Sequence, residues 1–272
     1  MRLGIFAKTF ARPALEDALD AVLASGVRAI QFNLALTGGP SLPPAIPAAL
    51  ADAVRAAVAE RELEMAAVSG TYNMAHPDAG VRRDGAAALA ELIAAAPRLG
   101  TRVVTLCTGT RDRDDMWRAH PDNGTPAAWR DAVESIGAAV AVAERHGVVL
   151  AFEPEHNNVV VDAAAGRRLL DEIGSPRLRV VLDAANLIRP GELGRQGDTL
   201  RAAVALLGDA LVLAHAKDVQ PDGTVVAAGR GALDYGLYVS LLREAGYDGP
   251  LVLHGLGEAE VPAAVGFLRG YL

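Results

Sequence analysis

The sequence predicts a protein of the α/β class, folded as a single closed (β/α)₈ barrel over residues 1–272. Two observations carry this prediction. Eight short apolar runs recur along the chain, and Ala-, Leu- and Arg-rich segments of helical period separate them. No linker and no break in composition divides the chain, so we expect one domain rather than two.

The eight apolar runs contain few polar residues, which is typical of parallel strands that are buried on both faces. Several of them end on an ionisable residue, and this sets the strand ends apart from the apolar strand interiors. Strands are expected at Arg2–Phe6, Val27–Asn33, Leu63–Gly70, Arg102–Thr108, Val148–Glu153, Leu178–Asp183, Ala210–Asp218 and Leu251–His254.

The segments between these strands have the period of amphipathic helices. Examples are Ala14–Gly26, Ala127–Gly147 and Tyr235–Gly246, and each ends in a glycine, the usual signal at a helix C-terminus. A doubly wound open sheet would use the same alternation of strands and helices. However, no GxGxxG motif follows the first strand, which removes the commonest dinucleotide-binding version of that sheet.

Composition and charge argue against several classes of protein. The net charge is −7 and no basic run is present, so we expect no nucleic-acid partner. The single cysteine, Cys107, is interpreted as an inert buried thiol, and its isolation fits a reducing compartment. The sequence has no signal-peptide core and no run of roughly 18 apolar residues that would span a membrane. We therefore expect a cytoplasmic protein with no membrane partner.

Ionisable side chains gather at the ends of the predicted strands. In a (β/α)₈ barrel, the carboxyl ends of the strands and the loops that follow them form the active site. Glu153, Asp183 and His215 come from three successive strands, and we expect them to converge on one point. Two carboxylates and an imidazole suit a divalent metal ion such as Mn²⁺, Mg²⁺, Co²⁺ or Zn²⁺. The alternative is that helix N-termini and loop amides satisfy these side chains without a ligand.

The motifs AFEPE, VVLDAAN and AHAKD, with GALDYGLYVSLLREAGYDGPLVLHG, resemble the xylose-isomerase-like TIM barrel superfamily of sugar isomerases and epimerases. The resemblance covers most of the chain and is strongest from Glu153 onward. It implies a metal site formed by a Glu, an Asp, a His and a second Glu on the last four strands. It also implies that the two glutamates exchange a proton with the sugar. Glu153, Asp183 and His215 fill the first three places.

The chain departs from the family at two positions. His254 stands where the resemblance implies the second glutamate. Asn186 stands where many epimerases of this type carry a histidine, and we expect it to contact the substrate. An imidazole can ligate a divalent metal ion and can also act as a base near neutral pH. His254 is therefore interpreted either as a fourth metal ligand or as an acid/base that opposes Glu153.

Two further residues at the strand ends are candidate substrate contacts. Glu155 shares the strand face of Glu153, and Lys217 shares that of His215, because successive residues of a strand alternate between its faces. We expect Glu155 to bind sugar hydroxyls. Lys217 either holds a substrate hydroxyl or phosphate, or pairs with Asp218 or another carboxylate at the rim.

The loops supply the remaining candidates. His76 is either a substrate contact at the rim or a packed core histidine. The loop that begins near Arg111 is long, which is typical of a functional lid, with a solvated surface loop as the alternative. Within it, Arg111 is expected to hold an anionic group, and Trp117 or His120 to cover the substrate. Arg230 lies between two glycines, which suits phosphate or carboxylate binding but also suits a plain turn.

Together these residues predict a divalent-metal-dependent isomerase or epimerase that acts on a small sugar, a sugar phosphate or a related polyol. Glu153 is expected to be a ligand and the base, with Lys217 and Arg111 as substrate contacts. A lyase of the keto-inositol dehydratase type would use the same proton abstraction, so it remains an alternative. A barrel that binds a ligand without catalysis is a second alternative, which the missing glutamate favours.

The same superfamily also contains metal-dependent endonucleases for abasic sites in DNA. Their chemistry needs a cluster of metal ions, many His and Glu ligands and a basic groove. Six histidines and an acidic net charge argue against this function. The oligomeric state stays open, with a homodimer as one option.

Overall fold

The computed structural model describes residues 1–272 and contains a closed barrel of eight parallel strands, which confirms the predicted (β/α)₈ fold. The strands follow each other around the barrel in chain order, and β9 closes it by pairing with both β7 and β1. All eight lie within or overlap the runs predicted from the sequence. The strands are β1 Arg2–Phe6, β2 Ala29–Phe32, β3 Glu64–Ser69, β4 Val103–Cys107, β5 Val149–Glu153, β6 Leu178–Asp183, β7 Leu211–Val219 and β9 Pro250–Leu253.

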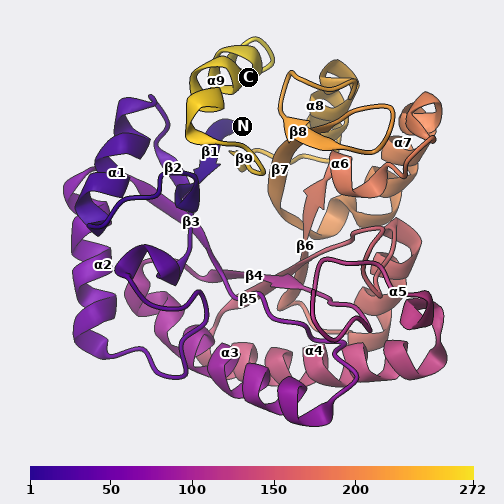
Figure 1. Cartoon of the computed structure of the whole chain (residues 1–272), viewed down its shortest axis with the longest axis horizontal. Helices are drawn as coiled ribbons and strands as arrows, with labels where there is room; N and C mark the ends of the chain where they lie inside the picture. The colour runs from indigo at the N-terminus through magenta and orange to yellow at the C-terminus, as the bar shows by residue number, and fades with distance from the viewer.

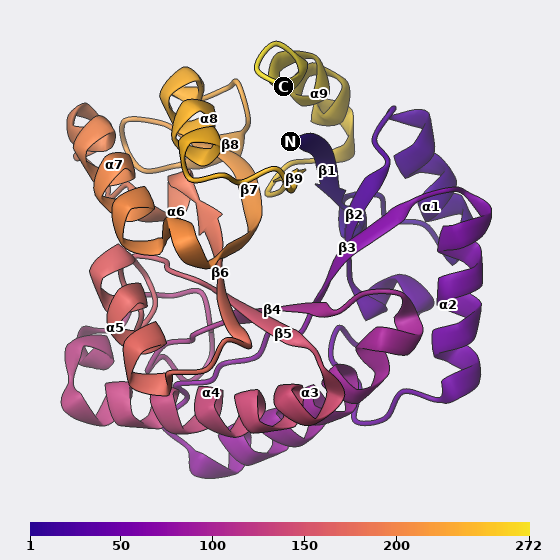
Figure 2. The ribbon, with the colours of Figure 1, turned by 180° about the vertical axis from the view of Figure 1, so that it is seen from behind.

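The helices form a ring around the outside of the barrel, and both chain termini lie on the same side of that ring (Figure 1). The view from behind shows the same ring, with the strands inside it (Figure 2). None of the helices combines the length and the apolar character that a membrane span needs. The helices are α1 Leu15–Ala24, α2 Ala48–Glu60, α3 Ala79–Leu99, α4 Pro126–His146, α5 Ala163–Ile173, α6 Ala184–Leu187, α7 Gln196–Leu207, α8 Tyr235–Glu244 and α9 Val261–Arg269.

The glycines that follow predicted helices adopt the backbone conformation that ends a helix. Gly100 and Gly147 directly follow α3 and α4, with φ of 108° and 64°. Other residues rarely adopt this left-handed conformation, so glycine is the residue that ends these helices at low cost. The chain can therefore turn within one or two residues into β4 and β5, which carries Glu153 to the mouth of the barrel.

The inside of the barrel is filled by a small apolar cluster that lies directly below the polar strand ends. It contains one side chain from each of five strands: Ala67, Ala151, Val181, Leu213 and Val252. All five are at most 1% exposed. Because every second residue of a strand faces the same side, the residue two positions later on each strand also faces the barrel interior. This spacing places Glu153, Asp183, His215 and His254 just above an apolar floor.

A ninth strand, β8 (Val225–Ala227), was not predicted from the sequence. It forms an antiparallel hairpin with the end of β7, in which Lys217 is paired with Ala227. A run of three residues is too short to give a recognisable strand pattern. The hairpin extends β7 beyond the barrel and fixes the backbone on which Lys217 is carried.

Candidate active site

Glu153, Asp183 and His215 meet at the carboxyl ends of β5, β6 and β7. Glu153 and Asp183 are the last residues of their strands, and Asp183 is paired with His215 in the register of β6 and β7. One donor atom from each of the three residues lies within 4.8 Å of the other two. His215 Nδ1 lies 3.3 Å from Glu153 Oε1 and 3.7 Å from Asp183 Oδ2. The structure thus brings these three side chains together.

A glutamine on the opposite wall of the barrel orients His215. Gln31 Nε2 donates to Thr105 Oγ1 at 3.2 Å, which turns the amide oxygen of Gln31 towards His215. His215 Nε2 lies 2.7 Å from this oxygen, and because an amide oxygen only accepts, Nε2 carries the proton. Nδ1 therefore faces the two carboxylates. Metal-binding histidines in proteins are held in the same way, with one nitrogen fixed by a neighbour and the other free to bind.

Lys217 places a positive charge among the carboxylates. Its Nζ donates to Asn186 Oδ1 at 2.8 Å and lies 3.1 Å from Asp183 Oδ2 and 3.9 Å from Glu153 Oε1. Asn186 completes this network, because its Nδ2 donates to Glu153 Oε1 at 2.5 Å. The side chain of Lys217 is only 10% exposed. Such a buried ammonium is stable only with acceptors on several sides, and the two carboxylates and the amide supply them.

The cluster holds Glu153 and Lys217 in their charged forms. Burial raises the pKa of Glu153, but the neighbouring His215 and the Lys217 ammonium outweigh it and bring that pKa below its ordinary value. Burial lowers the pKa of Lys217, but Asp183 and Glu153 outweigh it and bring that pKa above its ordinary value. For Asp183, burial prevails over the attraction of Lys217 and raises the pKa. Near neutral pH, the site therefore presents the Glu153 carboxylate and the Lys217 ammonium.

His254 lies in a stack of rings at the end of β9. Its ring centroid is 5.0 Å from that of Phe6 and 5.0 Å from that of His215, with interplanar angles of 7° and 24°. Its Nδ1 is buried without a hydrogen-bond partner. Burial, followed by the neighbouring His215 and Lys217, lowers the pKa of His254 to about 3, so the ring is neutral at neutral pH. His254 does not belong to the group of donor atoms formed by the other three residues.

A cavity of about 390 Å³ opens above this cluster. Glu153, Glu155, Asn186, Lys217 and His254 line it, together with His215. Glu155 Oε2 accepts a hydrogen bond of 3.3 Å from Asn158, and burial and the Glu153 carboxylate raise the pKa of Glu155 to about 7. The cavity thus adjoins the Glu–Asp–His group and presents carboxylate, ammonium, amide and imidazole groups to a small ligand.

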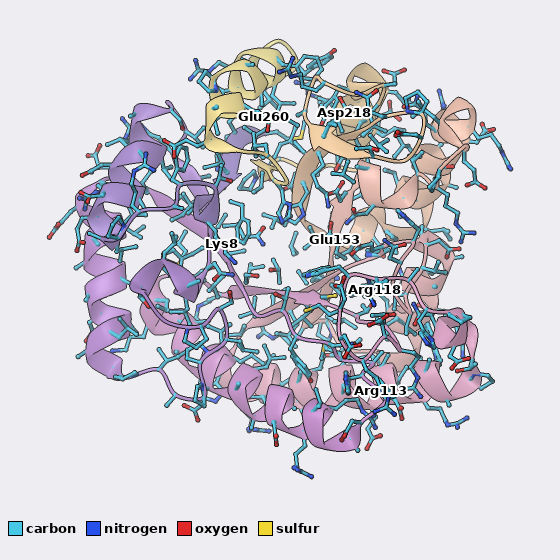
Figure 3. The ribbon with its side chains drawn as sticks, in the orientation of Figure 1. Lys8, Arg113, Arg118, Glu153, Asp218 and Glu260 are labelled. Carbon is cyan, nitrogen blue, oxygen red and sulfur yellow. The ribbon has the colours of Figure 1, made fainter.

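The mouth of the cavity is formed by segments from opposite sides of the barrel. Lys8 comes from the segment after β1, and Glu153 from the end of β5; both labelled side chains lie at the centre of the ring of helices (Figure 3). Met116 and Trp117, from the long loop after β4, also line the cavity, and Trp117 is 49% exposed. His120, the other candidate of this loop, accepts a hydrogen bond from the backbone nitrogen of Asp122 and does not line the cavity.

Two of the predicted substrate contacts lie in a hydrogen-bonded network away from the cavity lining. His76 is buried, with its Nδ1 accepting from the backbone nitrogen of Asp78 and its Nε2 3.2 Å from the carbonyl oxygen of Arg113. Arg111 donates to Asp131 Oδ2 at 2.7 Å and to the carbonyl oxygen of Ala75. These contacts fix the loops after β3 and β4. The structure thus places His76 in a buried hydrogen-bonded position between these two loops.

The loop after β8 also lies outside the cavity lining. Its Arg230 is exposed, and its backbone oxygen accepts a hydrogen bond from Gln220. The carboxylate of Asp218 accepts from the backbone nitrogens of Gly229 and Leu233 and so holds this loop. Asp218 is therefore not the partner of Lys217, whose ammonium is bound by Asp183 and Asn186.

Sequence reasoning did not identify several residues of the site, among them Phe6, Lys8, Gln31 and Thr105. A signal was present for two of them. Gln31 is the single polar residue of β2, and Lys8 is one of only two lysines in the chain. Phe6 and Thr105 fit ordinary apolar strands, and only their positions across the barrel reveal their contacts with His254 and Gln31.

The fold and the site define a (β/α)₈ barrel protein that carries a Glu–Asp–His group at the carboxyl ends of three successive strands. The chain belongs to the xylose isomerase-like TIM barrel family, whose model matches residues 19–271. No curated protein sequence matches the chain.

Solved structures of the same fold resemble the whole chain. A 3-keto-D-glucoside 4-epimerase from E. coli has a TM-score of 0.78 and 19% identity, and the match covers 99% of each chain. A D-psicose 3-epimerase from Clostridium cellulolyticum H10 has a TM-score of 0.72 and 17% identity, covering 100% of this chain and 99% of the other. These similarities show a shared fold over the full length of the barrel.

The Glu–Asp–His group fits a divalent metal ion. Its donors are two carboxylates and one imidazole nitrogen, a set that binds Mn²⁺, Co²⁺ or Zn²⁺. Asp183 Oδ1 accepts from the backbone nitrogen of Ala185, which fixes the carboxylate, while the buried Oδ2 has the Lys217 ammonium as its cationic neighbour at 3.1 Å. A buried carboxylate oxygen needs such a cationic partner, and a divalent ion could take the place of the ammonium.

Proposed function

We propose that the chain is a divalent-metal-dependent isomerase or epimerase that acts on a small sugar or a related polyol. The observation that carries the proposal is the Glu153–Asp183–His215 group at the base of a cavity that also contains a buried ammonium. Membership of the xylose isomerase-like family supports it, as does the full-length resemblance to structures described as sugar epimerases.

In this proposal, Glu153, Asp183 and His215 hold the metal ion. When bound, the ion supplies Lewis acidity that polarises the carbonyl and hydroxyl oxygens of the sugar. Glu153 removes the proton from the carbon next to the carbonyl. Its lowered pKa keeps it deprotonated, and Asn186 fixes one of its oxygens. Lys217 binds a sugar oxygen that gains negative charge as the proton leaves.

In place of a second strand-end glutamate, the cavity lining contains His254 from the end of β9 and Glu155 from the segment after β5. His254 is neutral and stacked on Phe6, which suits a hydrogen bond to a sugar hydroxyl or the return of a proton. Glu155 reaches the same cavity from the segment after β5. We propose His254 as the group that faces Glu153 across the sugar, and Glu155 as a contact for sugar hydroxyls.

Proton exchange with solvent tests this proposal. The Mn²⁺-loaded protein is incubated in deuterated water with a panel of ketoses and 3-keto sugars, and loss of the exchangeable C–H signal is followed by NMR. We expect exchange with at least one sugar, reduced about 10²- to 10⁴-fold by Glu153→Gln because the base is lost. Glu91→Gln, an exposed change on α3, is the matched control.

Two outcomes would count against the proposal. Exchange at the wild-type rate in Glu153→Gln would remove Glu153 from its role as the base. Formation of a dehydrated product, with loss of water from the sugar, would instead assign the protein to the lyases.

A further inference from the structure

The two lysines of the chain both line the cavity above the Glu–Asp–His group. Lysine and arginine together number 26, yet only Lys8 and Lys217 are lysines. An ammonium is a compact charge on a flexible stem, whereas a guanidinium is a wide planar fork. Lys8 has no carboxylate within ion-pair distance, whereas Lys217 has two, Asp183 and Glu153. Lys217 therefore neutralises buried carboxylates, whereas Lys8 has no carboxylate partner.

Lys217 binds the same two oxygens that face the metal-binding nitrogen of His215. Its Nζ lies 3.1 Å from Asp183 Oδ2 and 3.9 Å from Glu153 Oε1. These two atoms are 3.7 Å and 3.3 Å from His215 Nδ1. Metal–oxygen distances in proteins are about 2.0–2.2 Å, so an ion bound to these oxygens would lie close to the ammonium. Two cations at that separation repel each other strongly in a buried site.

A third contact of the Lys217 ammonium, to Asn186, can persist when a metal ion occupies the two carboxylates. Asn186 Oδ1 accepts a hydrogen bond of 2.8 Å from Lys217 Nζ, and it lies on α6 rather than in the Glu–Asp–His group. The four-carbon stem of lysine allows the ammonium to move while β7 and the β7–β8 hairpin hold its backbone.

We propose that Lys217 is an internal cation that competes with the divalent metal ion, and that metal binding displaces its ammonium from Asp183 towards Asn186 and the cavity. Without the ion, Lys217 neutralises two buried carboxylates that would otherwise destabilise the fold. With the ion bound, the same ammonium becomes available to a substrate oxygen. The inference rests on the metal site of the proposed function. It adds that the affinity for the metal ion is lowered by the free energy needed to displace the Lys217 ammonium.

Metal affinity in a Lys217→Met variant tests the competition. Mn²⁺ binding is measured by calorimetry for the wild type, Lys217→Met and Lys8→Met. The last variant removes the other cavity lysine and so controls for the general loss of a positive charge. We expect Lys217→Met to bind Mn²⁺ at least about tenfold more tightly, and Lys8→Met to change the affinity by less than about twofold. Equal or weaker binding by Lys217→Met would overturn the competition and leave the proposed function standing.

Thermal unfolding separates this result from a failure of the metal site itself. In a chelator, Lys217→Met should melt at a lower temperature than the wild type, and saturating Mn²⁺ should bring the two melting temperatures together. If neither protein binds Mn²⁺ or gains stability from it, both the competition and the metal dependence of the proposed function are wrong.

A measurement on the wild type covers the case in which Lys217→Met does not fold. Because the chain has only two lysines, reductive methylation followed by peptide mass spectrometry reports on Lys217 relative to Lys8. We expect Mn²⁺ to raise the relative rate at Lys217 at least about threefold, since the displaced ammonium enters the open cavity. A ratio that stays constant or falls would contradict displacement.

Discussion

The two walls of the cavity are built in opposite ways. On the β5–β7 side, Glu153, Asp183, His215 and Lys217 are joined by ion pairs and hydrogen bonds, and Gln31 supports them from across the barrel. On the β9–β1 side, His254 and Phe6 form a neutral stack with an unpaired ring nitrogen. The first wall holds charged groups in fixed positions, whereas the second presents flat aromatic rings and a neutral imidazole nitrogen. The charged groups are therefore concentrated on one wall.

Among changes on the charged wall, Asp183→Asn should have the largest effect on Mn²⁺ affinity. The change halves the carboxylate charge offered to a cation, so we expect Mn²⁺ affinity to fall by at least about 100-fold. This exceeds the loss expected when only a residue that hydrogen-bonds to a metal ligand is removed. The rise in melting temperature that Mn²⁺ gives the wild type should disappear. Asp122→Asn, at a carboxylate that is 67% exposed, should behave as the wild type. An unchanged Mn²⁺ response in Asp183→Asn would remove Asp183 from the metal site.

Gln31→Leu should weaken the same wall from a distance. Without the amide oxygen, His215 Nε2 loses its acceptor and the ring is no longer held with Nδ1 towards the carboxylates. Mn²⁺ affinity should fall about 10- to 100-fold, as measured by calorimetry. Thr105→Val, which removes only the partner of Gln31, should have a smaller effect. Equal affinities in the wild type and Gln31→Leu would show that His215 needs no such support.

His254, on the neutral wall, should make the free energy of unfolding depend on pH. His254 stays neutral in the native state down to about pH 3, whereas in the unfolded chain it binds a proton below about pH 6.5. The unfolded state therefore binds more protons between these values, and stability falls as the pH falls. Each pH unit below 6.5 costs about 1.4 kcal/mol, or about 2 kcal/mol from pH 6.5 to pH 5.

His254→Phe should remove this loss, because phenylalanine keeps the stack and cannot bind a proton. Urea unfolding of the metal-free protein at pH 7.5 and pH 5 measures it, with His146→Gln at an exposed helix end as the control. The free energy of unfolding of His254→Phe should fall by about 2 kcal/mol less than that of the wild type. An identical fall in both proteins would mean that His254 is not a buried neutral histidine.

Trp117→Ala should have the smallest effect, because the indole covers the cavity mouth from a loop and belongs to neither wall. We expect KM for the sugar to rise about two- to tenfold, the range that a lost aromatic contact gives. The free energy of unfolding should change by less than about 0.5 kcal/mol, since the side chain is 49% exposed. Val81→Ala, at an exposed apolar residue of α3, is the control for the loss of surface area. An unchanged KM would leave Trp117 outside the substrate site.

The strands and the charged wall could be predicted from the sequence because both follow from local patterns. Buried parallel strands are nearly continuous apolar runs, and Glu153 and Asp183 end two of them. In a closed barrel, the ends of neighbouring strands meet at one rim, so the pattern also predicts that the residues lie together. The resemblance to sugar isomerases added the expectation that these residues occupy the ligand positions of the family.

The neutral wall and the loops could not be predicted in the same way. The stacking of Phe6 on His254 joins the first and last strands, and no local pattern records a contact over that separation. Arg111 is predicted to hold an anionic group because it follows a strand closely, and the path of its loop brings it to the carboxylate of Asp131. A charged residue in a long loop has many carboxylates within reach, and only the fold decides between them.

The apolar floor formed by Ala67, Ala151, Val181, Leu213 and Val252 seals the barrel beneath the Glu–Asp–His group. The cavity therefore lies on the carboxyl-terminal side of this floor, and in the proposed function the metal ion and the sugar would both enter from that side. The ion site lies at the bottom of this passage, and a sugar that fills the cavity of about 390 Å³ would stand above it. Under the proposed function, loading would therefore follow a fixed order, with the ion entering first and a bound sugar slowing the escape of the ion.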